Sequence, residues 1–580
     1  MRIWIINILL TALFLASCGK KASKQFEFSG GTLTMALEHE PSTYVPRNVT
    51  DYYSATVLSQ MVEGLVSLDP KNSTVVPKLA ESWTKSADGL TYTFTLREDV
   101  LFHASDLLSE KQRKFTAEDV VSSIEVACTS DGAGNTPSTY SYIFQGLLKG
   151  ADEFNAGTAK SISGLTIKGN TVSFELLNED NNFLHKLTNV NAAISPKAII
   201  GKESEHNVIG TGPFIFSKLE EGEVPRIILT KNEDYYLKDD EGNALPYLDS
   251  LVFVIQSKKL EQLEMFESKE IDLIAGLPTS RITMMLEGRI DEFNSKPPKL
   301  VLANNPLLEA NFYFFNLKDE RFKDPRVRKA FNYAINKEVI GREILRNQYY
   351  DLGYYGITPP VSKALKGYDF KSIRKTGYDY NPEKARKLLA EAGYPNGEGF
   401  GSVELRFNIN DIHSSVADEF SKQIAQVLGV NINIDGSTFE QLQKDWETGN
   451  GDIFRMGWSA DYPSPETFLM NFYGKFVPEN PNEASKLNYS RYKNPIFDQF
   501  YEAGKAAPRK TDQMINFSKA EIALMEDPPI IPLWYTGDIE ITYSYIRDFH
   551  FNALNSYDFT RVYLKEWTAA EYQEQLSVKQ

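Results

Sequence analysis

The stretch from Val62 to Val120 constrains the fold more than any other part of this chain of 580 residues. Residues 65–68 form a short apolar run that ends at a turn sequence, and residues 91–96 alternate threonine with larger apolar residues. A two-residue period is typical of a half-buried strand. Asp88-Gly89 indicates a hairpin turn before the second run, because glycine adopts a positive φ at little cost. The stretch predicts ordered strands and a hairpin, and it contains no catalytic motif.

Three helix starts are marked by their capping residues. Thr116 and Asp119 have the spacing of a capping box. Asp324 and Asn381 each precede a proline, which suits the first position of a helix because the N–H that it lacks would be unbonded there. The apolar residues that follow fall on one stripe and are expected to face the core: Val327, Ala330, Phe331, Ala334 and Ile335 in one helix, and Ala385, Leu388, Leu389 and Ala392 in the other, which stops at Gly393.

Further strands are predicted at residues 32–37, 214–216, 227–232 and 251–255. The turn Gly210-Thr-Gly-Pro-Phe214 lies before one of them. It lacks the third glycine and the following helix of a dinucleotide-binding loop, so we do not interpret it as a phosphate site.

The order of these parts resembles solute-binding protein family 5, the extracytoplasmic receptors of oligopeptide and dipeptide ABC importers. The similarity includes the GTGPF turn, the VRKAFNYAIN helix and the YNPEKARKLLAEAGYPNG element, and it runs from about Thr32 to about Tyr563. It implies an α/β fold of the periplasmic-binding-protein type II kind, with two lobes around a cleft and an extra small domain. Lobe I would comprise residues 26–53, 191–299 and 531–575, the small domain II residues 54–190, and lobe II residues 300–530.

The first 25 residues indicate an export and anchoring signal. Residues 1–17 carry Arg2 as their only charge and an apolar run too short to span a bilayer comfortably, as in a signal peptide. Leu15-Ala-Ser-Cys18 matches a bacterial lipobox, in which Cys18 would be lipidated and residues 18–25 would form a flexible tether. The alternative is an ordinary signal peptide that happens to contain a cysteine.

Charge and cysteine content exclude several function classes. The net charge is −16, and removal of Arg2 with the signal peptide would make it −17, which argues against nucleic acid as a partner. Cys128 is the only cysteine besides Cys18, so we expect no disulfide. The six histidines share no metal-binding spacing, and there is no GxSxG motif. We therefore expect no metal, no cofactor and no enzyme activity.

Residues 451–468 are the strongest candidate for a ligand site. An apolar strand there runs into Asp461 and two prolines, so this carboxylate falls where regular pairing stops. The residues alone allow a turn cap for Asp461 and a salt bridge for Arg455. The family resemblance implies that Asp461 pairs with the α-ammonium group of a peptide and that Arg455 holds its carboxylate, for which a planar guanidinium is suited.

Three further residues are weaker candidates. Trp458 could line a side-chain pocket or belong to the core. Glu40 lies where the family offers main-chain groups to an extended ligand, although the adjacent Pro41 has no N–H to donate. Tyr140 falls near a cleft tyrosine of oligopeptide receptors, and a structural role is the alternative.

These observations predict a monomeric receptor for short peptides, lipid-anchored through Cys18 on the periplasmic or extracytoplasmic side of a membrane. It would deliver its ligand to separate permease and ATPase subunits of an ABC transporter. Two alternatives remain open at this point. One is a receptor for another solute of the same family, such as an oligosaccharide, nickel or haem, since a fold does not fix its ligand. The other is a secreted carboxylate-dependent hydrolase.

Overall fold

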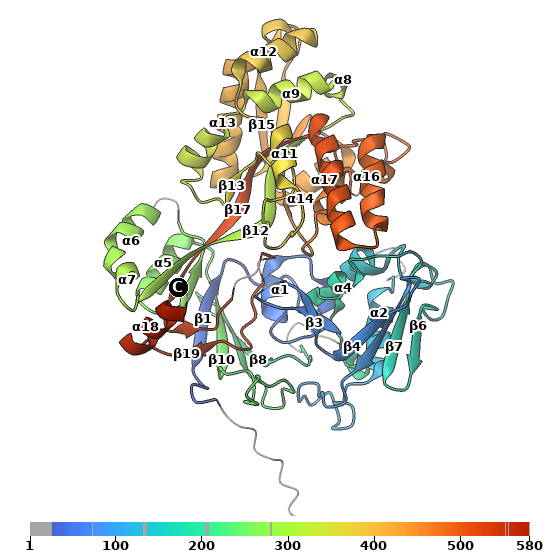
Figure 1. The fold of residues 1–580 in the computed structure, drawn as a ribbon, viewed down its shortest axis with the longest axis vertical. Helices are drawn as coiled ribbons and strands as arrows, with labels where there is room; N and C mark the ends of the chain where they lie inside the picture. Colours follow the sequence, from blue (N-terminus) through green and yellow to red (C-terminus); the bar gives the residue numbers. More distant parts are fainter. Residues whose placement is uncertain are drawn as a thin grey trace, which may run out of the picture.

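A computed structural model describes residues 26–71, 73–130, 136–202, 208–278, 281–485, 487–550, 553–554 and 556–578. The predicted signal peptide, the tether and Cys18 lie outside the described residues. Figure 1 shows an upper lobe joined to a broader lower part, which consists of a second lobe on the left and a small domain on the right. The lower lobe and small domain contain the N-terminal half of the chain, and the upper lobe contains most of the C-terminal half.

An eleven-stranded mixed sheet runs through both lobes. The pairs β1 with β10 and β14 with β15 are parallel, whereas β12 is antiparallel to both of its neighbours. A short strand β13 (Asp351–Leu352) pairs with β17 off the main path. In sheet order the other strands are β15 (Ile432–Ser437), β14 (Val403–Asn408), β16 (Ile453–Ser459), β12 (Leu300–Phe315), β17 (Ile530–Tyr543), β11 (Leu273–Ala275), β1 (Thr32–Leu37), β10 (Ser250–Ile255), β9 (Arg226–Lys231) and β8 (Phe214–Glu220).

The strands β12 and β17 belong to both lobes at once. Their first segment of pairing joins residues 300–306 to 543–537, and after a bulge a second segment joins residues 310–314 to 535–530. Figure 1 shows the two strands rising together from the lower lobe into the upper one. The pairing thus breaks register between Pro306 and Ala310, and the boundaries at 300 and 530 stay a prediction.

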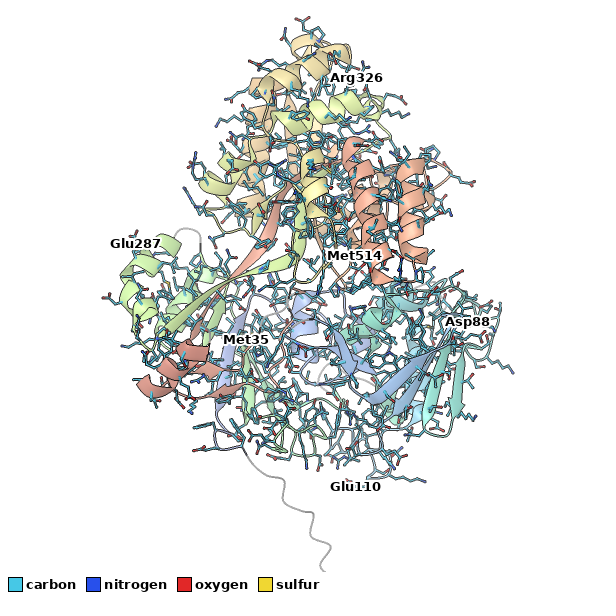
Figure 2. All side chains as sticks on the ribbon, in the orientation of Figure 1. Met35, Asp88, Glu110, Glu287, Arg326 and Met514 are labelled. Carbon is cyan, nitrogen blue, oxygen red and sulfur yellow. The ribbon has the colours of Figure 1, made fainter. Side chains whose placement is uncertain are left out.

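The small domain is built on a separate four-stranded sheet, in which the predicted hairpin is confirmed. Its turn has Gly89 at φ +76°, and Figure 2 places Asp88 at the outer side of the domain. Tyr92, Phe94 and Leu96 are buried while the threonines between them are half-buried. The elements are β4 (Ala80–Lys85), β5 (Thr91–Leu96), β7 (Thr171–Glu175) and β6 (Leu165–Lys168), with α2 (Ala117–Ala127), α3 (Ala151–Asn155), α4 (Phe183–Lys186) and the pair β2 (Val66–Leu68) and β3 (Val75–Pro77).

The hydrophobic core of this domain contains residues from Leu65 to Ile209. The helix α1 (Tyr52–Leu58) packs instead in the core of the lower lobe, against β1 and β10. The capping box at the start of α2 is confirmed, with the backbone N–H of Thr116 donating to Asp119 Oδ2 at 2.8 Å.

The two proline-led helices of lobe II also form as predicted. They are α9 (Pro325–Ala334), capped by Asp324, and α12 (Pro382–Glu391), capped by Asn381. The stripe of α9 is fully buried, whereas Leu388 and Ala392 of the α12 stripe are only partly buried. The other helices of lobe II are α8 (Glu320–Lys323), α10 (Lys337–Val339), α11 (Phe370–Thr376), α13 (Asp411–Leu428), α14 (Phe439–Thr448), α15 (Glu466–Leu469), α16 (Pro495–Ala506) and α17 (Lys510–Glu526).

The lower lobe adds α5 (Lys259–Glu267), α6 (Ile282–Gly288), α7 (Ile290–Asn294), α18 (Ala569–Val578) and the pair β18 (Ile546–Arg547) and β19 (Tyr563–Leu564). Cys128 is a free, buried thiol. Within the described ranges, none of the helices has both the length and the apolar character needed to cross a membrane.

Candidate functional site

A cavity of about 600 Å³ lies where the two lobes and the small domain meet. Pockets of this size hold small organic ligands. The lower lobe contributes Asp51 and Tyr557 to its wall, the small domain contributes Tyr142, and lobe II contributes Glu309 and Asp461. A ligand in this cavity would touch all three parts of the molecule.

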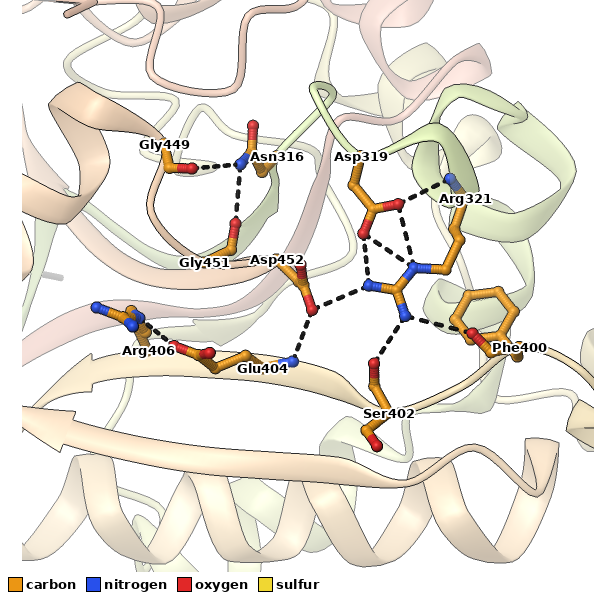
Figure 3. Close-up of polar contacts among 10 residues, drawn as sticks. All are labelled: Asn316, Asp319, Arg321, Phe400, Ser402, Glu404, Arg406, Gly449, Gly451 and Asp452. Atoms are coloured by element: carbon orange, nitrogen blue, oxygen red, sulfur yellow. Dashed lines mark hydrogen bonds and ion pairs between the residues drawn. The ribbon is translucent and has the colours of Figure 1, made fainter. Parts of the chain in front are cut away.

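The strand β16 leads into the part of the cavity wall that lobe II contributes. Polar contacts fix the residues at its start, and the residues at its end line the cavity. Figure 3 shows its start, where Arg321 donates to the carboxylates of Asp319 and Asp452 and to the carbonyl oxygens of Phe400 and Ser402. Asp452 also accepts a hydrogen bond from the backbone N–H of Glu404 at 2.9 Å. The strand ends at Ser459, and the next two residues, Ala460 and Asp461, line the cavity.

Asp461 is a carboxylate with few partners. Thr467 Oγ1 donates to its Oδ2 at 3.2 Å, and no salt bridge reaches it within the described part of the chain. Burial raises the pKa of Asp461 to about 6; Thr467 and Lys186 act against this rise, and Glu466 adds to it. Removal from water disfavours an unpaired charge, so this carboxylate is stabilised by any cation that enters the cavity.

Next to Asp461 the small domain touches lobe II. Asn182 Nδ2 donates to Glu466 Oε2 at 3.2 Å, and Asn181 Nδ2 donates to the carbonyl oxygen of Ala507 at 2.5 Å. Lys186 lies 2.6 Å from Asp180 within the small domain. Figure 1 shows α4, which carries Lys186, directly below α16 and α17. The small domain thus contacts lobe II five residues beyond Asp461, at Glu466.

Arg455 lies outside the cavity wall. It is opposite Tyr313 in the β12–β16 pairing, and its Nη2 donates to Asn311 Oδ1 at 2.5 Å and its Nη1 to Asn408 Oδ1 at 3.4 Å. Its Nε is buried without a hydrogen-bond acceptor, and burial lowers the pKa of the guanidinium to about 10. The carboxylate-binding role suggested for it stays a prediction.

The remaining candidates also lie away from the cavity. Trp458 packs against the lobe II core and directs its Nε1 toward Thr467 Oγ1 at 3.5 Å. Glu40 is exposed on the turn after β1. Tyr140 is buried and donates its hydroxyl to Asp152 at 2.8 Å, and its place in a ligand site stays a prediction. Tyr142, two residues later on the same turn of helix, lines the cavity in its place.

Of the wall residues named above, sequence reasoning identified Asp461 and missed Asp51, Tyr557, Tyr142 and Glu309. The apolar run of β12 carries one glutamate at its centre, and that interruption was the available signal for Glu309. Among the described residues, no group of histidine, cysteine and acidic side chains is arranged to hold a metal ion.

Comparison with known proteins agrees with this architecture. Residues 74–479 match the bacterial extracellular solute-binding proteins, family 5. The chain belongs to this family. The di/tripeptide-binding protein 2 of Pseudomonas aeruginosa is 26% identical over 565 residues, which cover 94% of this chain and 97% of that protein. The heme-binding protein A of Haemophilus influenzae is 25% identical over 544 residues, covering 91% and 92%.

Among solved structures, the periplasmic binding protein DppA of Helicobacter pylori, in complex with the peptide STSA, superposes with a TM-score of 0.73. It is 24% identical and covers 93% of this chain and 99% of its own. The fold is therefore that of a family 5 solute-binding protein, with two lobes around a central cavity and an additional small domain. Relatives named for peptides and for heme share it, so the ligand has to be argued from the cavity.

Proposed function

We propose that this protein is the peptide receptor of an ABC importer. It captures short peptides in the cavity between its lobes and delivers them to the membrane permease. The relatives named as di/tripeptide-binding and oligopeptide-binding proteins support this choice. The proposal extends to an extracytoplasmic monomer held at the membrane through lipid on Cys18.

The observation that carries the proposal is Asp461 at the end of β16. Among the residues that the structure describes, the hydroxyl of Thr467 donates to this carboxylate in the cavity wall and no cation lies within salt-bridge distance of it. A free peptide brings an α-ammonium group, which neutralises this charge and gains a charge-assisted hydrogen bond. An uncharged sugar offers no such group, so this wall favours the peptide.

The experiment compares peptides that differ only at their amino terminus. The protein is unfolded and refolded to remove bound ligand, and then titrated calorimetrically with tripeptides that have free or acetylated amino groups. We expect acetylation to weaken binding by at least tenfold, because it removes the cation that Asp461 needs. Asp461→Asn should weaken binding of the free peptide to a similar extent while the acetylated peptide is little affected.

Thr438→Ala serves as a matched control, because its side chain caps α14 away from the cavity. It should leave the preference for the free amino terminus unchanged. Equal binding of free and acetylated peptides would disprove the role of Asp461. Hydrolysis of a peptide or glycoside during the titration would indicate an enzyme in place of a receptor.

A further inference from the structure

The charge of the cavity wall is strongly unbalanced. Lys78 is the single lysine or arginine among the described residues that line it, and its Nζ lies 3.2 Å from Glu63. One ammonium against five carboxylates leaves a formal charge of −4 on the wall. The five carboxylates are Asp51, Glu63, Glu309, Asp461 and Asp558.

Glu309 is the member of this set that lies nearest to Asp461 along the sheet. It is directly opposite Ser459 in the β12–β16 pairing, and Ser459 is two residues before Asp461. Two residues of extended chain span roughly 7 Å. Both side chains line the cavity from neighbouring positions of lobe II, so one peptide bound there can contact both.

Neutral groups orient Glu309 without cancelling its charge. Thr536 Oγ1 donates to its Oε1 at 2.7 Å and Ser459 Oγ to its Oε2 at 3.0 Å. Arg455 lies within electrostatic range, but it donates to Asn311 and Asn408, and no salt bridge to Glu309 forms in the described part of the chain. Glu309 thus holds an oriented negative charge toward the cavity.

The other three carboxylates of the wall belong to the lower lobe and the small domain. Glu63 pairs with Lys78 and accepts from the hydroxyls of Thr211 and Tyr235. Asp51 caps α1 through the backbone N–H of Ser54. Asp558 accepts a hydrogen bond from the backbone N–H of Thr560 at 2.8 Å. Glu309 and Asp461 are the two carboxylates that lobe II contributes to the wall, so a ligand cation on that side of the cavity can pair with either of them.

We propose that the cavity selects peptides by charge, with Glu309 as the specificity-determining residue for a basic side chain at the first or second position. This inference rests on the proposed peptide-receptor function. While Asp461 binds the α-ammonium, Glu309 binds the lysine or arginine of the same or the next residue. An aspartate or glutamate there would face an unpaired like charge in a partly desolvated site, which costs affinity.

The test measures dissociation constants of the ligand-free full-length protein for Ala-Ala-Ala, Lys-Ala-Ala, Ala-Lys-Ala, Glu-Ala-Ala and Ala-Glu-Ala. The readout is the ratio between the glutamate and the lysine peptide at each position. We expect this ratio to be at least ten at one of the two positions. In Glu309→Gln the ratio should fall at least threefold, because the amide keeps the shape but not the charge. Glu175→Gln, which changes an exposed carboxylate paired with Lys149 on the small domain, should retain the wild-type ratio.

The outcomes separate the two proposals. If all five peptides bind with similar affinity, charge selection is overturned while the peptide receptor stands. A wild-type ratio that persists in Glu309→Gln would overturn the assignment to Glu309. Absence of binding for every peptide would overturn the receptor function, and the charge selection with it.

Discussion

Burial raises the pKa of two carboxylates in different regions of lobe II, but their roles differ. Asp461 lies in the cavity wall at the end of β16, with a pKa of about 6. Glu521 lies on α17 in the core, and burial raises its pKa to about 7. Glu521 accepts hydrogen bonds from the backbone N–H groups of Ile357 at 2.6 Å and Thr358 at 2.8 Å and from the hydroxyl of Tyr368.

The difference lies in the donors and in what the carboxylate faces. The three donors to Glu521 come from residues 357–368, more than 150 positions earlier in the chain. These bonds hold residues 356–358 against α17. Asp461 has the hydroxyl of Thr467 and an open cavity. A raised pKa by itself therefore marks burial, and the missing partners beside a cavity indicate a ligand site.

The largest effect is expected on stability, when Glu521 is replaced. Glu521→Ala leaves the backbone N–H groups of Ile357 and Thr358 buried without acceptors, while the hydroxyl of Tyr368 keeps only the longer bond to the carbonyl oxygen of Phe517 at 3.4 Å. At about 1–3 kcal/mol for each of the two unsatisfied groups, the free energy of unfolding should fall by roughly 2 kcal/mol or more. Urea denaturation of the ligand-free protein measures this change.

Glu521→Gln is the control, because its amide oxygen can still accept from the two backbone groups. It should retain most of the stability lost in Glu521→Ala. A loss below about 1 kcal/mol in the alanine variant would contradict a structural role, since that is the scale of a single typical hydrogen bond.

The pH dependence of peptide affinity tests the role of Asp461 in ligand binding. The α-ammonium pairs with ionised Asp461, so binding below pH 6 must first remove a proton from this group. Affinity should fall as the pH is lowered through about 6, approaching tenfold per pH unit, and stay level from there to about pH 7, where the α-amino group of the peptide (pKa about 7.7–8.0) is still protonated. Titrations from pH 5 to pH 7 measure this, and Asp461→Asn should abolish the dependence. A flat profile in the wild-type protein would argue that another group binds the ligand cation.

A smaller effect is expected from the single donor of Asp461. Thr467→Val keeps the shape of the side chain but removes the hydroxyl that stabilises the ionised carboxylate, so the pKa of Asp461 should rise further. A typical hydrogen bond of about 0.5–1.5 kcal/mol predicts a loss of peptide affinity of roughly two- to tenfold at pH 6. Tyr368→Phe, which removes a donor from Glu521, should lower stability without changing affinity. If both variants affected affinity equally, the two carboxylates would not be functionally distinct.

Much of the fold followed from local sequence signals. The Asp88-Gly89 hairpin and the capping box of Thr116 and Asp119 depend on residues close together in the chain, and the structure has both. The register between β12 and β17 was not predicted, because it joins residues more than two hundred positions apart. The end of a strand before Asp461 can be read from neighbouring residues, whereas the positions of Tyr142 and Glu309 in the cavity wall depend on long-range packing and were missed.

The sequence by itself determined the family, the order of the elements and the carboxylate at the end of β16. These depend on periodicity, capping residues and turn residues, which act over a few positions. The tertiary structure decided which side chains share the cavity. Asn182 donates a hydrogen bond to Glu466, 284 positions later in the chain. Arg455 donates to Asn311 and Asn408 on the two neighbouring strands. Such contacts follow from how the lobes and the small domain pack together, and no local pattern encodes that packing.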